Sequence, residues 1–408
     1  MSHPYAKLED YQFWPKAMTA SAPGHVNPAL PMQKMILPGH RIATIGSCFA
    51  QHLARHILHS GLDYLVTEKA PEGVDPVVAR QRNFGVFSAR YGNVYTVRQA
   101  VQLFDRAFDA FKPADVAWKK DEVSVDPFRP GIEPGGFQSP EALAEDVVRH
   151  LACVREVFVQ SDWIIFTLGL TEAWRSKADG AIYPIAPGVA GGVFDPEQHE
   201  FVNFTAGEVA ADLCAFRDRL HQVNPNAKIM LTVSPVPLAA TYENRHVWLS
   251  TTYSKAALRV AADEVVRKFE NVFYFPSYEI ITSPAAGNRY YDDDLRSITE
   301  LGVNHVMRVF FRSCCQFPDE QESASVAQHA IDGLGKDMEI VCDEDMIAQA
   351  VHGNASPASQ PAVKQEDFDE ALYLQLNPDV AKAVEAKKFK SGWHHYELHG
   401  RREGRRVG

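Results

Sequence analysis

Short runs of hydrophobic residues alternate, up to about residue 320, with longer segments in which hydrophobic residues recur every three or four positions. The short runs at 41–46, 163–169, 228–233 and 272–275 are typical of strands that are covered on both faces. A segment that begins at Thr205 places its hydrophobic residues on one face of a helix. Strands separated by crossover helices predict an α/β fold with a mostly parallel sheet.

The pattern changes after this region, and the polar, proline-containing segment 353–362 is typical of a linker. Residues suited to helix starts follow at Asp367, Asn377 and Ser391, and each precedes a short predicted helix. The sequence therefore predicts three parts: a large domain at 1–320, a partly helical connector and linker at 321–365, and a small all-α module at 366–408.

Composition and charge narrow the classes of protein. Hydrophobic residues make up 46% and charged residues 23% of the 408 residues, which excludes a disordered chain. The net charge of −11 disfavours nucleic-acid binding, because an acidic surface repels phosphate. No signal peptide and no stretch of about 18 apolar residues is evident, so we expect a cytoplasmic protein without a transmembrane segment. The six cysteines lack Cys-x-x-Cys spacing and should stay thiols, and we expect neither a metal nor a cofactor.

The segment 45–50, Ile-Gly-Ser-Cys-Phe-Ala, stands between the first predicted strand and its helix. Parallel sheets bind ligands at the carboxyl ends of their strands, and the N–H groups at a helix start stabilise an anion. Of these residues, Cys48 is affected most by this position. A helix N-terminus would lower the pKa of its thiol from the reference value of about 8.5 and so favour the reactive thiolate. The sequence therefore predicts a nucleophile at Cys48; a small buried cysteine in a tight turn is the structural alternative.

The five residues 46–50, Gly-Ser-Cys-Phe-Ala, are the signature of the GSCFA family, which the chain resembles over roughly residues 10–315. Four further phrases carry the resemblance: Arg90-Tyr-Gly-Asn-Val-Tyr-Thr, Thr167-Leu-Gly-Leu-Thr-Glu-Ala-Trp, Thr232-Val-Ser-Pro-Val-Pro, and Asp293-Asp-Leu-Arg ahead of His305. The family is related to the SGNH or GDSL hydrolases. The resemblance therefore implies a flavodoxin-like three-layer α/β sandwich, SGNH-hydrolase-like, with the small all-α module appended.

In that superfamily a Gly-Asp-Ser turn after the first strand carries a serine nucleophile. Gly46 matches the glycine, Ser47 falls on the aspartate, and Cys48 falls on the nucleophile. This departure favours a thiol nucleophile over a serine nucleophile. Ser47 is the alternative nucleophile if the turn is shifted by one residue.

The superfamily's base is a histidine near the C-terminus, usually with an aspartate three residues earlier. His305 fits by location, but Gly302 stands three residues before it. The candidates for the orienting acid are then Asp292, Asp293, Asp294 and Glu300, and Asp294 or Glu300 would need to fold back to reach the imidazole. A cysteine nucleophile tolerates a poorly placed orienting acid, because a Cys–His pair can rest as thiolate and imidazolium.

The superfamily also implies donors for the oxyanion of a tetrahedral intermediate. Besides the N–H of Cys48, the matching positions are Gly169, Thr171, Gly92 and Asn93. Glu172 has three possible roles: it orients His305, binds a substrate hydroxyl, or pairs with Arg90 or Arg175.

The function implied is an esterase or O-acyltransferase that acts on an acylated small molecule or carbohydrate, such as a polysaccharide precursor. The alternative is a catalytically degenerate binding or scaffold protein of surface-polysaccharide assembly. The C-terminal segment resembles modules found beside bacterial glycosyltransferases, which implies polysaccharide-assembly proteins as partners. From Lys387 onward it carries seven Lys or Arg and two Glu, a basic patch in an acidic protein.

Overall fold

The computed structural model describes residues 3–22, 24–30, 32–317, 340, 342–352, 368–385 and 389–396. The chain forms two compact units, Met1–Glu344 and Asp345–Gly408. The first unit extends beyond the predicted domain end at 320, because Cys342, Asp343 and Glu344 bond to residues of the large domain. Most of the predicted connector 321–365 lies outside the described residues.

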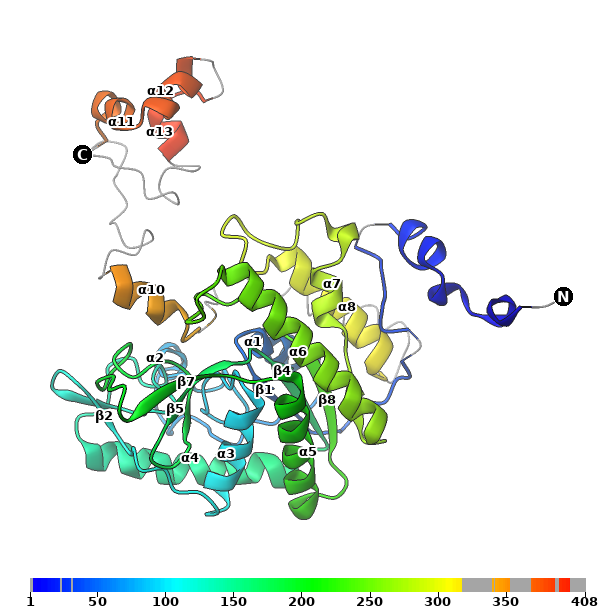
Figure 1. The fold of residues 1–408 in the computed structure, drawn as a ribbon, viewed down its shortest axis with the longest axis vertical. Coiled ribbons are helices and arrows are strands. Elements are labelled where there is room, and N and C mark those ends of the chain that lie inside the picture. Colours follow the sequence, from blue (N-terminus) through cyan, green and yellow to red (C-terminus); the bar gives the residue numbers. More distant parts are fainter. Residues whose placement is uncertain are drawn as a thin grey trace. The chain divides into compact units, whose positions relative to one another are not determined.

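A four-stranded parallel sheet with the order β1-β4-β8-β9 forms the centre of the first unit (Figure 1). Its strands are β1 (Ile42–Gly46), β4 (Trp163–Leu168), β8 (Lys228–Val233) and β9 (Val272–Tyr274). The four strands predicted from the hydrophobic runs are confirmed, and so is their parallel pairing. Every residue of β1 and β4 is buried, as expected of strands covered on both faces.

Helices cover both faces of this sheet and give an α/β structure of three layers. On one face, α1 (Phe49–His59), α7 (Ser277–Ile281) and α8 (Glu300–Cys314) pack in a core with Trp163, Ile165 and Met230. On the other face, α3 (Val97–Ala107), α4 (Pro140–Gln160), α5 (Ala206–Val223) and α6 (Val247–Lys268) share a core with Ile164, Phe166 and Leu231. Neighbouring residues of one strand thus belong to different cores, because side chains alternate across a sheet. Figure 1 shows α5 and α6 side by side in front of β8.

The remaining elements are short. An antiparallel sheet of order β6-β5-β7 contains β5 (Glu172–Ser176), β6 (Ile182–Tyr183) and β7 (His199–Asn203), and a hairpin pairs β2 (Trp118–Lys120) with β3 (Val123–Val125). The other helical segments among the described residues of the first unit are α2 (Pro76–Gln81), the 3-10 turns Pro4–Lys7, Asp10–Gln12 and Pro284–Ala286, and a π-helical turn at Pro15–Thr19.

Side-chain caps fix where the main helices begin. The Thr205 hydroxyl accepts from the backbone N–H of Glu208, whose carboxylate accepts from the Thr205 N–H in return, so the predicted cap is confirmed. Thr96 and Gln99 form the same capping box at the start of α3. These caps satisfy N–H groups that the helix itself leaves unpaired.

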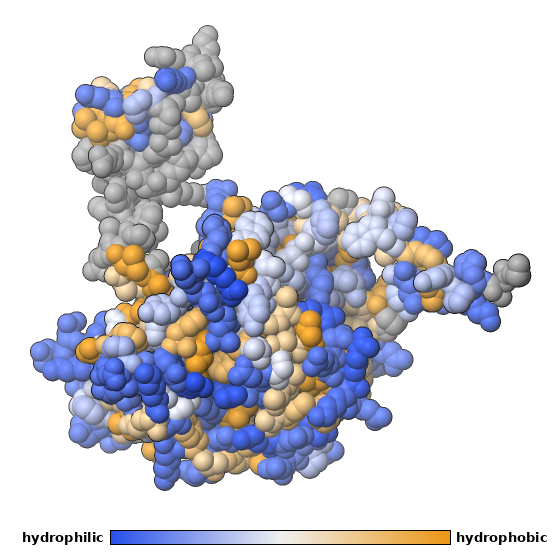
Figure 2. Space-filling model, viewed as in Figure 1, coloured by the Kyte–Doolittle hydropathy of each residue, from blue (hydrophilic) through white to orange (hydrophobic). Residues whose placement is uncertain are grey.

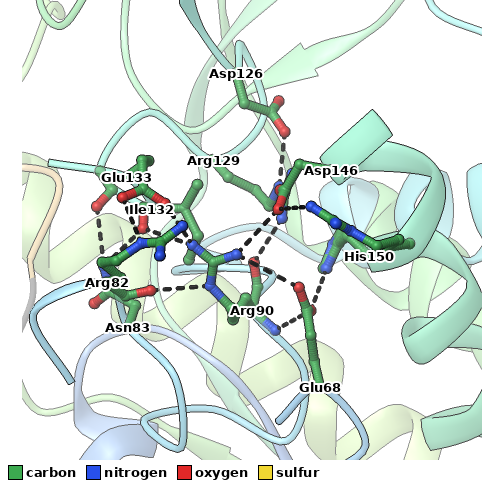
Figure 3. Close-up of polar contacts among 12 residues, drawn as sticks. Glu68, Arg82, Asn83, Arg90, Asp126, Arg129, Ile132, Glu133, Asp146 and His150 are labelled. Atoms are coloured by element: carbon green, nitrogen blue, oxygen red, sulfur yellow. Dashed lines mark hydrogen bonds and ion pairs between the residues drawn. The ribbon is translucent and has the colours of Figure 1, made fainter. Parts of the chain in front are cut away.

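A network of buried charges holds the region between α2 and α4 (Figure 3). The guanidinium of Arg90 donates to Asp146 at 3.2 Å, and that of Arg129 donates to the other oxygen of Asp146 at 2.9 Å. His150 bonds to Glu68 at 2.8 Å. Removing one partner of a buried ion pair leaves an uncompensated charge at a high cost, so each member depends on the others.

The same network fixes the main chain of Arg90. Its N–H donates to Glu68 at 2.7 Å, and its carbonyl accepts from Arg129 at 3.2 Å. The segment 91–95 follows directly, so its position is set by charges that are almost fully buried. This segment lies at the carboxyl edge of the sheet and lines the candidate site described below.

The second unit contains α10 (Asp345–His352), α11 (Glu370–Leu376), α12 (Pro378–Glu385) and α13 (Gly392–His395). The last three lie near the positions predicted for short helices, and Ser391 caps α13 as expected. The cap of α11 is Asp369, whereas the predicted start at Asp367 lies outside the described residues. Tyr373, Val380 and Tyr396 form their small common core. Most of the basic segment that begins at Lys387 lies outside the described residues.

None of the described helices combines the length and apolar character needed to cross a bilayer. Figure 2 shows hydrophilic side chains spread over the visible face, with hydrophobic ones between them.

Three buried histidines and the half-buried His52 predict a loss of stability in weak acid. Burial above all lowers the pKa of His52 to about 3 and those of His56, His150 and His305 to about 4. Between pH 6.5 and 4 the unfolded chain therefore binds more protons than the folded one, and stability falls as the pH falls. Urea denaturation at pH 7, 6 and 5 should show midpoints that decrease with pH.

Replacement of one such histidine should weaken this dependence. In His150→Gln the slope of the unfolding free energy against pH should fall by up to about 1.4 kcal/mol per pH unit, which is the slope that a difference of one bound proton produces. His59→Gln, at an exposed ring, is the control. A wild-type midpoint that is constant from pH 7 to 5 would contradict the prediction.

Candidate functional site

The turn after β1 brings Ser47 and Cys48 against the end of β4. Gly46 has φ +133°, and a Cβ there would lie 2.1 Å from the carbonyl oxygen of Thr167. Only glycine allows this approach. The N–H of Ser47 then donates to the same carbonyl at 3.0 Å, and Cys48 takes the N-cap position of α1. The sequence prediction that this motif joins a strand end to a helix start is confirmed.

The segment 91–95 bridges the ends of the two strands. The N–H of Val94 donates to Gly46 at 2.8 Å, and the carbonyl of Tyr95 accepts from Gly169 at 3.0 Å and from Leu170 at 3.2 Å. A Cβ on Gly169 would lie 3.0 Å from the Tyr95 oxygen and 3.1 Å from the Cβ of Ser47. Because Gly169 has no side chain, Tyr95 and Ser47 can both lie close to its main chain. The hydroxyl of Ser47 is buried without a hydrogen-bond partner among the described residues.

A buried lysine stands beside this turn. Lys255 is 2% exposed, and its Nζ donates to the Gly169 carbonyl at 2.6 Å. Burial lowers the pKa of Lys255 to about 8, against the raising influence of Glu344 and Cys48. The ammonium and the Cys48 sulfur are thus close enough for their charges to interact. An amine of this kind can exchange a proton near neutral pH.

Sequence reasoning missed Lys255, although a signal was present. The residue lies three positions before Leu258 and ten before Val265, on the buried face of a helix that the sequence predicted. A lysine on the apolar face of a helix is rarely accommodated without a partner or a function. The approach of Lys255 to Gly169 depends on packing across 86 residues and has no local signal.

Three consecutive residues, Cys342, Asp343 and Glu344, cover the site; we call them the 342–344 cover. Asn93 donates to the Asp343 carboxylate at 3.0 Å, and the Asp343 N–H donates to the Tyr95 hydroxyl at 3.0 Å. The cover is therefore bound through both main chain and side chains to the segment 91–95.

Arg296 holds the other end of the 342–344 cover. Its guanidinium donates to Glu344 at 3.0 Å and to the sulfur of Cys342 at 3.5 Å. The N–H of Ala239, in the loop after β8, donates to the second Glu344 oxygen at 3.1 Å. Sequence reasoning gave no role to Arg296 and none to the cover, which lies beyond the motifs that carried the resemblance.

The electrostatics of Cys48 differ from the expectation of a reactive thiolate. A hydrogen bond with Cys342, burial, and the charges of Cys342 and Glu344 raise the pKa of Cys48 well above its ordinary value, while Arg296 acts in the opposite sense. Cys48 is 5% exposed. The helix N-terminus would lower the pKa of Cys48, but burial and acidic neighbours outweigh this effect. With the cover in place Cys48 is therefore a protonated thiol.

His305 does not hydrogen-bond to Cys48 as the resemblance implied. Its Nε2 donates to the Val26 carbonyl at 2.9 Å, and its Nδ1 accepts from the Tyr290 hydroxyl at 2.7 Å. Both ring nitrogens are thus used within the core beneath α8. Location along the chain was a poor guide, because residues one or two positions apart on α8 point in different directions.

The proposed orienting acids also lie elsewhere. Asp294 accepts from the N–H groups of Arg296 and Ser297 and from the Ser297 hydroxyl, so it shapes its own loop. Glu300 is exposed in the first turn of α8. Neither carboxylate has a hydrogen bond to His305, whose two ring nitrogens have the partners given above.

Thr171 and Glu172 bond to the loop and helix beyond β8 and to the small sheet. The Thr171 hydroxyl donates to Asn203 at 2.7 Å, so it does not point to an oxyanion as expected. Glu172 accepts from the Thr241 hydroxyl at 2.7 Å and from the Tyr242 N–H at 3.3 Å. Its predicted pairing with Arg90 or Arg175 is wrong, since these bind other carboxylates. Donation from Gly92 to an oxyanion stays a prediction, whereas the N–H of Gly169 already donates to the Tyr95 carbonyl.

Within the ranges that the structure describes, no group of three or more His, Cys, Asp or Glu side chains could hold a metal ion.

The model of the GSCFA family matches residues 41–310. The matched span runs from β1 into α8 and includes Cys48, Lys255 and Arg296, while the 342–344 cover lies outside it. Comparison with curated proteins and with solved structures gave no match.

The 342–344 cover predicts that removal of one acidic charge makes Cys48 more reactive. Glu344→Gln removes a charge that raises the Cys48 pKa and weakens the bond to Arg296. Alkylation of Cys48 by iodoacetamide at pH 8, followed by peptide mass spectrometry, should become about three- to tenfold faster. Glu270→Gln, an equal charge change at an exposed site, should leave the rate unaltered. Equal rates for the Glu344 and Glu270 variants would show that the cover does not protect Cys48.

Proposed function

The chain belongs to the GSCFA family, and we propose that it is an esterase or O-acyltransferase that transfers an acyl group through Cys48. One observation carries the proposal: a thiol at the carboxyl end of a central parallel strand stands among two cationic side chains, Lys255 and Arg296. Opposite charges favour a thiolate, and parallel sheets place ligands at this edge. When the 342–344 cover leaves, the groups that most disfavour the thiolate leave with it.

Lys255 takes the role that the resemblance assigned to His305. As a neutral amine it accepts the Cys48 proton, and the sulfur attacks the acyl carbonyl carbon. The ester oxygen leaves with the proton returned by the Lys255 ammonium, so an S-acyl intermediate forms and an alcohol departs. Water or an acceptor hydroxyl then attacks the thioester, and the thiol is regenerated with the new acid or ester as product.

The oxyanion of this reaction needs donors fixed in advance. The Cys48 N–H at the start of α1 and the Gly92 N–H are the backbone candidates, with Asn93 Nδ2 beside them once Asp343 withdraws. The N–H of Gly169 is not available, because it donates to the Tyr95 carbonyl. Ser47 is the alternative nucleophile, because its unpartnered hydroxyl lies on the same turn and packs against Gly169.

The relation to SGNH hydrolases supports this assignment and also revises it. In that superfamily an aspartate stands three residues before the catalytic histidine, and Asp293 stands three residues before Arg296. Arg296, rather than His305, is the residue next to Cys342 and Glu344 at the site. An arginine cannot serve as the base at neutral pH, which is why the buried amine of Lys255 carries that role.

An acylated carbohydrate or polysaccharide precursor is the substrate class that the resemblance favours. Polysaccharide-assembly proteins are the partners that the C-terminal helices would meet.

The replacement of the base by Arg296 also supports a second candidate, a catalytically degenerate protein that binds a glycan without turnover. In that case Cys48→Ala would leave ligand affinity unaltered and wild type would have no esterase activity to lose.

Variant kinetics with a panel of activated acyl esters test the proposal. Cys48→Ala should lower kcat/KM by at least about a thousandfold, and Lys255→Met by about a hundredfold or more. His305→Gln is the matched control: it breaks core hydrogen bonds and lowers stability, yet its folded fraction should keep activity within about twofold. Ser47→Ala, run beside these variants, separates the two nucleophiles.

The pH profile identifies the base. Because Lys255 must be neutral to accept a proton, kcat/KM should rise with pH through the Lys255 pKa, which burial lowers below its ordinary value, and level off above it. Full activity in Lys255→Met, or equal activity in wild type and Cys48→Ala, would overturn the assignment.

A further inference from the structure

We propose that Cys48 and Cys342 form a reversible disulfide that shuts the site. The two thiols share a hydrogen bond although 294 positions of sequence separate them, and no disulfide joins them in the structure. Cys48 is buried, whereas Cys342 is half-buried. One sulfur is thus within reach of a small oxidant, and the other stands directly behind it.

The surroundings of Cys342 favour its oxidation. Arg296 donates to its sulfur at 3.5 Å, and the Tyr95 hydroxyl lies 3.6 Å away. A guanidinium beside a sulfur stabilises thiolate charge, and the thiolate is the form that a peroxide attacks.

The reaction balances with a hydroperoxide as oxidant. The Cys342 thiolate attacks one peroxide oxygen and becomes a sulfenic acid, and the other oxygen leaves as hydroxide or alkoxide, which takes up a proton. The Cys48 sulfur then attacks the Cys342 sulfur, the S–O bond breaks, and the departing hydroxide accepts the Cys48 proton to form water. Two thiols are oxidised by two electrons, and one peroxide is reduced.

Other cysteine pairs of the described chain are poorer candidates. Cys314 and Cys315 are adjacent and buried, and burial raises the pKa of each thiol well above its ordinary range. Cys153 and Cys214 are half-buried like Cys342, but they lie on different helices, α4 and α5, and neither has a cysteine partner in any hydrogen bond of the described residues.

The disulfide would fix the 342–344 cover over the site. Asn93, Tyr95, Ala239 and Arg296 already hold the cover by hydrogen bonds, which separate when it moves. A disulfide at Cys342 prevents the cover from moving away, and it also makes the Cys48 sulfur unavailable as a nucleophile. Oxidation therefore closes the site, and a thiol reductant reopens it.

The test uses the full-length protein. Reduced protein is treated with hydrogen peroxide, blocked with N-ethylmaleimide, and digested without reductant for mass spectrometry. A cross-linked peptide pair containing Cys48 and Cys342 is expected, and Cys48 labelling by iodoacetamide should fall at least about tenfold until dithiothreitol restores it. Cys342→Ser should abolish the cross-link, while Cys153→Ser, a half-buried cysteine elsewhere, should leave it intact.

A cross-link through other cysteines, or Cys48 that stays equally reactive after oxidation, would overturn the inference. If Cys342→Ser fails to fold, Cys48→Ser provides the second test, because it must also lose the cross-link. The test measures the mass of cross-linked peptides, so its result does not depend on whether the protein transfers acyl groups. A protein that forms the disulfide but hydrolyses no ester would refute the proposed function alone.

Discussion

The structure depends on the close approach of β1 and β4 at Gly46. Its main chain lies so near the Thr167 carbonyl that any side chain would overlap it, and the positive φ turns the following residues into the start of α1. This constraint places Ser47 against Gly169 and Cys48 at the helix N-terminus. The carbonyl of Gly46 also anchors Val94, so the same glycine positions the segment that binds the 342–344 cover. A larger residue at 46 would displace the whole edge of the sheet.

Buried charge serves two different purposes in this protein. Arg90 and Arg129 are each paired with carboxylates, and their network holds the main chain that leads into the site. At the site itself, Lys255 bonds to a neutral carbonyl, and its charge is balanced only at a distance. A buried ammonium without a direct counterion is costly, and such groups gather where proton transfer is required. The contrast favours a chemical role for Lys255 over a structural one.

Sequence patterns predicted the central strands, the cap at Thr205 and the strand-to-helix turn, because each depends on neighbouring residues. They failed for His305, since the choice between a site and a core position depends on how α8 packs. The buried face of α6 gave a signal for Lys255, but its contact with Gly169 could be found only in three dimensions. The 342–344 cover had no signal, because it returns to the site after a long stretch that carries none of the motifs. The raised pKa of Cys48 follows from that cover and was therefore also out of reach.

Acyl transfer through Cys48 requires that its sulfur carry the acyl group during the reaction. Intact-protein mass spectrometry after brief incubation with an activated acetyl ester, followed by peptide mapping, tests it directly. One added acetyl group per chain is expected, located on Cys48, sensitive to hydroxylamine, and missing in Cys48→Ala. An acetyl group on Ser47 or on a surface lysine, with Cys48 unmodified, would contradict it.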